Sequence, residues 1–177
     1  MIYLDEILQG VKTVGITGHI RPDGDCVGST LGVYNYICDN MPQVDVDICL
    51  QPINDKFLFL RNSDKIKEKA DGNKLYDLFI VCDCAAFDRF EDFRECFEKA
   101  GKTVVFDHHI SGQEIGDMNM ISPKLSSCSE LIYEAMNPDK ISKSTAECLY
   151  LGIIHDTRVF KYQGVTCLLY TSPSPRD

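Results

Sequence analysis

Aspartate and histidine residues gather at four separate places in the sequence. The groups are His19 with Asp23 and Asp25, then Asp83, then Asp107 with His108 and His109, and finally Asp156. Carboxylates mixed with imidazoles suit divalent ions such as Mn²⁺ or Mg²⁺. The chain contains no C-x-x-C pair, which argues against a structural zinc site or an iron–sulfur cluster. These residue types therefore predict a site for divalent cations, with Mn²⁺ as the first expectation.

Two cations explain the number of carboxylates better than one. Four aspartates packed within a few ångströms would repel one another strongly, whereas two divalent ions supply four positive charges against their four negative charges. A pair of ions roughly 3.5–4 Å apart can activate water and stabilise both the attacking and the leaving oxygen at phosphorus. The expected chemistry is therefore hydrolysis of a phosphate ester.

Each group also has a simpler explanation when it is taken alone. The stretch Asp23-Gly24-Asp25 could be a turn after a strand, a single histidine is often structural, and Asp107 could cap a loop. Against this, all four histidines of the chain lie in or beside the four groups: His19, His108, His109 and His155. The combination favours metal binding.

Regular elements must bring these distant groups together. Apolar or β-rich runs predict strands at 12–17, 44–49, 78–82 and 103–106, and the alternating acidic residues of the second indicate a strand near an edge. Apolar residues at helical spacing predict helices from Val27 onward, around 90–100, around 131–136 and over 146–154. Ser127 with Glu130 fits a capping box before the third helix.

This alternation predicts an α/β fold with a mostly parallel sheet and helices on both faces. Ligands collect at the carboxyl ends of parallel strands, so the four groups should meet at one edge of the sheet. Residues 110–125 show no clear period and are expected to form the longest loop.

The composition excludes several classes of protein. A chain of 177 residues, 44% hydrophobic and 25% charged, suits one globular domain. The net charge of −9 argues against a surface for long nucleic acid. No apolar run approaches the roughly 20 residues of a membrane span, and the N-terminus does not resemble a signal peptide. We therefore expect a cytoplasmic protein with reduced cysteines and no membrane partner.

The order of the four groups resembles the signature of the DHH phosphoesterase family. The matching stretches are H-I-R-P-D-G-D at 19–25, V-C-D at 81–83, D-H-H at 107–109 and H-D-T at 155–157. Within that family the chain is most similar to the bifunctional oligoribonucleases and phosphoadenosine-phosphate phosphatases, or nano-RNases. The resemblance covers nearly all of residues 1–166 and implies the DHH fold for this region.

The resemblance also implies a role for each residue. The ligands of one metal ion would be His19, Asp23 and Asp83. Those of the other would be Asp25, Asp83, His108 and Asp156. His109 would contact the scissile phosphate, and Asp107 would orient an imidazole. Mn²⁺ is the expected ion at both positions, with Mg²⁺ or Co²⁺ as substitutes.

Other matches and one departure lie close to these residues. Gly28 with Ser29 matches a G-S pair of the family, although tight helix packing explains a glycine equally well. Residues 126–130 resemble a family segment near the site. The family usually has glycine at the position of Arg158; if the backbone there requires a positive φ, arginine adds strain. Asp156 is therefore the least secure ligand.

A greater departure is length. Members of the family carry a second domain, DHHA1, whose glycine-rich, histidine-containing segment and basic residues bind substrate, and the sequence shows no such segment. We expect that residues 1–166 form the metal-binding catalytic domain, which binds Mn²⁺ but turns over little substrate alone. Residues 167–177 resemble a translated sequencing adaptor and are expected to be an unstructured artefact.

The sequence leaves the substrate open. Short oligoribonucleotides and 3′-phosphoadenosine 5′-phosphate are the first expectation, and cyclic dinucleotides or inorganic pyrophosphate are alternatives. A metal-dependent nucleotide-binding domain without catalysis is the alternative from a different class. The expected partners are thus a small nucleotide or short single-stranded RNA. A homodimer is one alternative for the oligomeric state.

Overall fold

A computed structural model describes residues 3–161. The adaptor-like tail and the last five residues of the expected domain lie outside the described residues. Five parallel strands form one sheet in the order β2-β1-β3-β4-β5. The strands are β1 (Thr13–Thr17), β2 (Asp45–Cys49), β3 (Leu78–Cys82), β4 (Thr103–Asp107) and β5 (Met118–Ile121). The predicted parallel sheet is confirmed, and β2 lies at an edge as expected.

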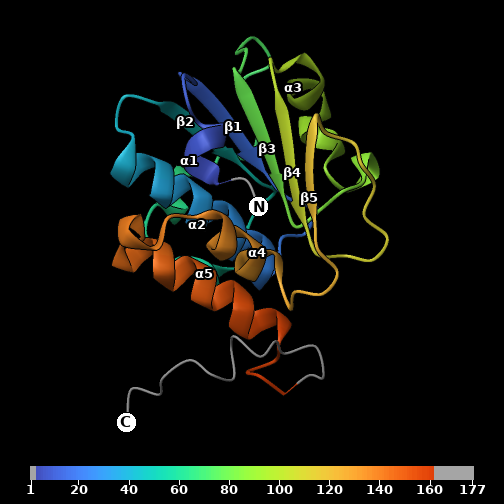
Figure 1. Cartoon of the computed structure of the whole chain (residues 1–177). Coiled ribbons are helices and arrows are strands. Elements are labelled where there is room, and N and C mark those ends of the chain that lie inside the picture. The colour runs from blue at the N-terminus through green and yellow to red at the C-terminus, as the bar shows by residue number, and fades with distance from the viewer. Residues whose placement is uncertain (1–2, 162–177) are drawn as a thin grey trace.

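Helices cover both faces of the sheet, unequally (Figure 1). The α-helices are α1 (Leu4–Ile7), α2 (Gly24–Asn40), α3 (Arg94–Lys99), α4 (Cys128–Ala135) and α5 (Lys143–Asp156). Short 3₁₀ helices are η1 (Asp55–Phe57), η2 (Ser63–Lys65), η3 (Phe87–Arg89), η4 (Glu91–Phe93) and η5 (Pro138–Lys140). The α/β fold with helices on both faces is therefore confirmed. No helix within residues 3–161 is long and apolar enough to span a membrane.

Alternate side chains of β3 belong to two different cores. Leu78 and Ile80 pack in the larger core, which is shared with α1, α2, α4 and α5. Phe79 and Val81 pack in a smaller core with Phe97 of α3 and other aromatic residues. Because successive side chains of a strand point to opposite faces, a strand buried on both sides reads as one continuous apolar run. This is why β3 was visible in the sequence.

Two elements differ from the predictions. The helix expected around 90–100 is present as α3 over Arg94–Lys99, but its first turn, Glu91–Phe93, is 3₁₀. Phe87, Phe90 and Phe93 recur every three residues, which is the period of a 3₁₀ helix. The loop expected over 110–125 contains β5, whose four residues are all partly exposed and give no apolar run.

Helices α2 and α5 pack closely because glycines lie between them. A Cβ added to Gly28 would lie 2.5 Å from the carbonyl oxygen of Cys148 in α5. One added to Gly32 would lie 2.6 Å from Leu149. The packing explanation for Gly28 thus holds. This close approach brings the C-terminal end of α5 to the carboxyl edge of the sheet, where Asp156 lies.

Candidate metal centre

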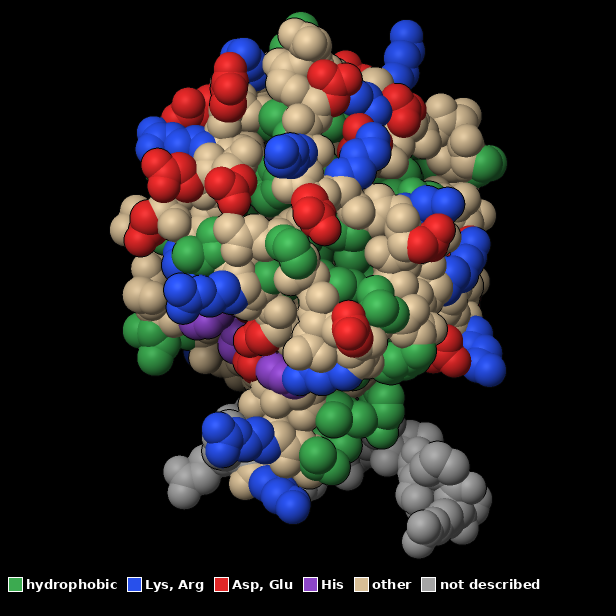
Figure 2. Space-filling model, turned by 180° about the vertical axis from the view of Figure 1, so that it is seen from behind, with side chains coloured by type: hydrophobic (Ala, Val, Ile, Leu, Met, Phe, Trp, Pro, Cys, Tyr) green, Lys and Arg blue, Asp and Glu red, His purple; other side chains and the backbone are tan. Residues whose placement is uncertain are grey.

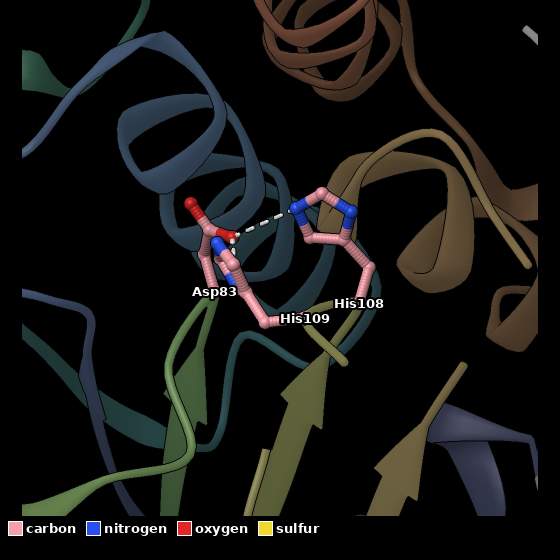
Figure 3. Close-up of side chains that lie close together, drawn as sticks. All are labelled: Asp83, His108 and His109. Carbon is pink, nitrogen blue, oxygen red and sulfur yellow. Dashed lines mark ion pairs between the residues drawn. The ribbon is translucent and has the colours of Figure 1, made fainter. Parts of the chain in front are cut away.

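The four aspartate and histidine groups meet at the carboxyl ends of the central strands. His19 follows β1, Asp83 directly follows β3, and Asp107 ends β4 before His108 and His109. Figure 3 shows β3 and β4 ending at these residues and both imidazoles directed toward the Asp83 carboxylate. Asp23 and Asp25 start α2, and Asp156 ends α5. The histidine side chains reach the surface together at one end of the molecule (Figure 2).

Asp83 lies at the centre of the cluster and is 3% exposed. Its Oδ2 is 3.4 Å from Nε2 of His19, and its Oδ1 is 3.5 Å from Nε2 of His108. Within the described part of the chain, Oδ1 has no hydrogen-bond partner. The backbone of Asp83 is left-handed, with φ 60°, and its N–H donates to the Phe106 carbonyl at 2.9 Å. Such conformations cost free energy and cluster at functional sites.

His19 is held so that one ring nitrogen faces the carboxylates. Its Nδ1 lies 2.8 Å from the carbonyl oxygen of Ile20, which makes Nδ1 the donor and leaves Nε2 as the atom toward Asp83 and Asp23. The distance from Nε2 to Oδ1 of Asp23 is 3.7 Å. Asp23 is the N-cap of α2, and its Oδ1 accepts hydrogen bonds from the N–H groups of Asp25 and Cys26.

Asp25 is fully buried and is fixed by the N-terminus of α4. Its Oδ2 accepts from the N–H of Cys128 at 2.6 Å, and its Oδ1 accepts from the N–H of Ser129 at 3.0 Å. Free N–H groups at a helix N-terminus favour a negative charge. The predicted cap of this helix is confirmed, because the Ser127 hydroxyl accepts from the N–H of Glu130.

Among the described residues, four sets of three side chains have ligand atoms within 4.8 Å of one another, including Asp83 with His108 and His109. Two of the four sets contain only residues predicted as metal ligands. One set is His19, Asp23 and Asp83. The other is Asp25, His108 and Asp156. Nε2 of His108 lies 3.2 Å from Oδ2 of Asp156 and 3.8 Å from Oδ2 of Asp25. Residues far apart in the sequence therefore form two adjoining groups, with Asp83 between the two imidazoles.

The donor set fits a pair of divalent cations. A buried carboxylate oxygen without a partner is costly, and a cation between Asp83 and the imidazoles would satisfy Oδ1. Carboxylates with imidazole are the donors that Mn²⁺ accepts readily. The eight described cysteines are free and none belongs to these groups, which argues against a thiolate site among the described residues.

The model of the DHH family, N-terminal domain, matches residues 13–153. The chain belongs to the DHH family. It is 32% identical over 162 residues to the probable bifunctional oligoribonuclease and PAP phosphatase NrnA of Streptococcus mutans, covering 90% of this chain and 50% of that protein. The Bacillus subtilis bifunctional oligoribonuclease and PAP phosphatase NrnA is 30% identical over 161 residues, covering 87% and 49%. The chain thus spans about half the length of these relatives.

A crystal structure of an exopolyphosphatase-related protein from Bacteroides fragilis has the same fold. The TM-score is 0.81 at 24% sequence identity, and the match covers 94% of this chain and 52% of that one. The similarity extends over nearly all of this chain, so it supports the topology of the whole described region of this DHH family member.

The D-H-H triplet, which gives the DHH family its name, contains two histidines whose side chains contact different residues. His108 faces Asp25, Asp83 and Asp156, as described above. His109 instead places Nδ1 2.7 Å from Oδ1 of Asp107, which is 1% exposed and also accepts from the backbone N–H groups of both histidines. The hydrogen bond to Asp107 raises the pKa of His109. His109 is therefore a half-exposed imidazole that tends to carry a proton.

Burial and charge shift the pKa values of the enclosed groups. Burial lowers the pKa of His19, but the neighbouring carboxylates of Asp23 and Asp83 outweigh this and raise it to about 10. Burial likewise lowers that of His108, and Asp83 with Asp25 raises it to about 9. Burial and the charge of Asp83 raise the pKa of Asp25 to about 8. Without cations the cluster therefore retains protons, which reduce its negative charge.

Two other carboxylates of the cluster shift in opposite directions. Burial acts to raise the pKa of Asp83, but the neighbouring imidazoles of His108 and His19 lower it overall. The pKa of Asp156 is raised, first by burial and then by the charges of Asp83 and Asp23, against a lowering effect of His108. The imidazole neighbours of Asp83 therefore favour its anionic form, and the pKa of Asp23 is lowered as well, against burial, by His19.

Some residues near the site were not singled out from the sequence. A pocket of about 170 Å³ opens beside Asp83 and His109, and Arg89 lines it. Nothing in the sequence indicated that Arg89, six residues after Asp83, would lie beside the site. His155 lies with Asp23 and Asp156, and their ligand atoms are within 4.8 Å of one another. His155 was noted as a neighbour of the fourth group but was given no role.

Arg158 departs from the usual glycine of the family at a position that does have a positive φ. Its φ is 46°, and those of Val159 and Phe160 are 59° and 60°. The left-handed turn therefore lies just beyond α5 and carries the strain expected of non-glycine residues. Asp156 nevertheless lies 3.2 Å from His108, so the turn does not remove this carboxylate from the cluster.

Proposed function

We propose that this chain carries the two-metal centre of a phosphoesterase that hydrolyses short oligoribonucleotides or 3′-phosphoadenosine 5′-phosphate with Mn²⁺. The observation that supports this most is the Asp83 carboxylate. It is buried, held in a left-handed conformation, flanked by His19 and His108, and has one oxygen without a hydrogen bond among the described residues. One ion would be held by His19, Asp23 and Asp83, and the other by Asp25, Asp83, His108 and Asp156.

Bound divalent ions would polarise the phosphate ester and lower the pKa of water, which makes hydrolysis feasible near neutral pH. The residues of the chain have separate tasks. Asp83 and Asp25 supply negative charge that two cations balance. The backbone N–H groups of Cys128 and Ser129 keep Asp25 in place. Outer hydrogen bonds of this kind orient ligands and tune their affinity.

His109 is the residue that we propose contacts the scissile phosphate. Its Nδ1 is engaged by Asp107, so Nε2 is the atom that remains for substrate. The raised pKa favours the protonated imidazole, which donates a hydrogen bond and carries positive charge. Charge-assisted hydrogen bonds to phosphate oxygens stabilise the charge that develops during hydrolysis.

The size of the pocket and the net charge support the proposed substrate class. The pocket beside His109 holds about 170 Å³, which suits a small group of a nucleotide and no extended strand. A net charge of −9 also disfavours a long polyanion. The printed names of the NrnA relatives describe oligoribonuclease and PAP phosphatase activities. Since the chain matches only half of those proteins, these activities are proposed for the whole protein that contains this domain.

Substitution of Asp83 tests the proposal. Asp83→Asn keeps the shape of the side chain and removes its charge, so we expect loss of Mn²⁺ binding in titration calorimetry and a fall in Mn²⁺-dependent dinucleotide hydrolysis of more than about 100-fold. The matched control is Asp88→Asn, because Asp88 is an exposed carboxylate after the same strand. This substitution should change neither Mn²⁺ binding nor the rate of hydrolysis. Unchanged Mn²⁺ binding in Asp83→Asn would reject the site. Mn²⁺ binding without hydrolysis in the whole protein that contains this domain would instead indicate a metal-dependent nucleotide-binding domain.

A further inference from the structure

We propose that His155 forms, with Asp23 and Asp156, a third cation position on the rim of the two-metal centre. The inference rests on the proposed function, because Asp23 and Asp156 are also ligands of the two central ions. The ion would be a hard divalent cation that accompanies the phosphate group of the substrate.

The geometry of the three side chains suits such an ion. Their ligand atoms all lie within 4.8 Å of one another. Ligands at roughly 2.1 Å from a Mg²⁺ or Mn²⁺ ion are separated by roughly 3 to 4.2 Å, so small side-chain movements suffice. Oδ1 of Asp23 accepts two backbone hydrogen bonds and faces His19, and a carboxylate has a second oxygen that can serve another ion. Asp156 likewise has one oxygen toward His108 and one to share.

The imidazole of His155 is held in place by packing. Its ring lies against the α-carbon of Gly24, so that a Cβ added to Gly24 would clash with the ring. The ring of Phe57 meets it edge-on, with centroids 6.2 Å apart and an interplanar angle of 73°. A ligand whose rotamer is fixed before binding loses little entropy when the ion arrives. His155 is therefore arranged as a donor and is not a freely moving surface histidine.

Charge balance predicts when this position is filled. Asp23, Asp25, Asp83 and Asp156 together carry four negative charges, which two divalent ions already neutralise. An imidazole nitrogen adds no negative charge when it binds a cation, so a third ion leaves an excess of two positive charges. A phosphate dianion cancels that excess. The third ion should therefore bind more weakly than the first two, and phosphate should strengthen its binding reciprocally.

Counting bound Mn²⁺ tests this directly. The metal-stripped 177-residue chain is dialysed to equilibrium against rising MnCl₂ at physiological ionic strength, which screens the acidic surface, with and without inorganic phosphate. We expect three ions per chain at saturation, and phosphate should tighten the third by about 5- to 150-fold. His155→Phe keeps a ring against Gly24 and Phe57 but removes both ligand nitrogens, and should bind two. Tyr150→Phe, at a mostly exposed position of the same helix, should still bind three.

The counts separate this inference from the function on which it rests. Two ions in both the wild type and His155→Phe would overturn the third position and leave the two-metal centre standing. Fewer than two ions in the wild type would overturn both. Three ions in His155→Phe would show that the third ion lies elsewhere and would also overturn the assignment. If His155→Phe fails to fold, a wild-type count of two still overturns the third position.

Discussion

Asp83 combines three features that are unfavourable in an ordinary protein interior. It is a buried carboxylate, its backbone is left-handed, and Oδ1 lacks a hydrogen-bond partner within the described residues. Each feature costs free energy, and a divalent cation relieves the electrostatic part. The residue types and their order were sufficient to predict that this aspartate lies with His19 and His108. Its left-handed backbone could not be predicted, because aspartate adopts that conformation only in some contexts.

Asp107→Asn tests the pairing of Asp107 with His109. The amide keeps an oxygen that accepts the backbone N–H groups but loses the charge that raises the pKa of His109. We expect a lower His109 pKa in an NMR titration and hydrolysis reduced by about 10- to 100-fold, with Mn²⁺ binding retained. An unchanged His109 pKa would contradict the role given to Asp107.

For Asp25, the sequence predicts the location of the side chain but not its hydrogen-bond partners. The N–H groups of Cys128 and Ser129 lie more than a hundred residues away in the chain. Backbone groups carry no signature in a sequence, so only the packing of α4 against α2 shows this contact. His155 was overlooked for a similar reason, because its contact with Gly24 and Phe57 is tertiary.

At the scale of elements, the N-terminus of α4 links helix stability to the metal centre. Ser127→Ala removes the hydroxyl that accepts from the N–H of Glu130. Loss of an N-cap costs about 1 kcal/mol, and the N–H groups that hold Asp25 belong to the same turn. We therefore expect a lower free energy of unfolding in urea and weaker Mn²⁺ binding. The control Ser144→Ala, in the first turn of α5, should leave Mn²⁺ binding unchanged.

The contact between α2 and α5 makes a second prediction for an element. Gly28→Ala gains about 1 kcal/mol in helix propensity. Its methyl group would, however, lie 2.5 Å from the Cys148 carbonyl, and backbone atoms give way only at a cost of about 1–3 kcal/mol. We expect net destabilisation in urea unfolding and weaker Mn²⁺ binding, since Asp156 moves with α5. Gly72→Ala, with nothing within 4 Å of the new methyl group, is the control. A Gly28→Ala variant as stable as wild type would contradict the tight packing.

Strong apolar patterns made most elements predictable, and weak ones did not. The strands β1, β3 and β4 lie in the middle of the sheet and are buried on both faces, which produces continuous apolar runs. Within residues 3–161, the short β5 pairs with β4 alone and is partly exposed, so its sequence carries no period. Phe90, Phe93, Phe97 and Ala100 predict one helix because spacings of three and four coexist in α-helices, and this spacing does not show that its first turn is 3₁₀.

At the scale of the whole molecule, the fold class was predictable from alternation of strands and helices, and the site from the rule that ligands lie at the carboxyl ends of parallel strands. The unequal distribution of helices over the two faces of the sheet could not be predicted, because no sequence pattern indicates which face a helix will pack on. The cluster also gives the molecule a pH dependence that cations should reverse.

The metal-free protein should lose stability as the pH rises. His19 and His108 have folded pKa values of about 10 and about 9, above the ordinary 6.5, so their contribution is full below about 6.5 and is lost as the pH passes those folded values. Asp25, whose pKa is raised from 3.8 to about 8, lowers the stability progressively between those two values and adds no further loss above about 8. We expect the midpoint of thermal unfolding in EDTA to fall between pH 6.5 and 10.

Mn²⁺ should change the sign of this trend. Ions require deprotonated imidazoles and carboxylates, so binding releases protons and strengthens as the pH rises. The thermal midpoint in excess Mn²⁺ should therefore rise from pH 6 to 8, and calorimetry in buffers of different ionisation enthalpy should detect the released protons. A parallel fall with and without Mn²⁺ would contradict metal binding by these groups.

Anomalous diffraction at the manganese edge from crystals grown with MnCl₂ tests the two-metal centre most directly. We predict two peaks roughly 3.5–4 Å apart. One should contact His19, Asp23 and Asp83, and the other Asp25, Asp83, His108 and Asp156. Crystals that diffract well, contain Mn²⁺ elsewhere, and show no peak at the Asp83 carboxylate would contradict it.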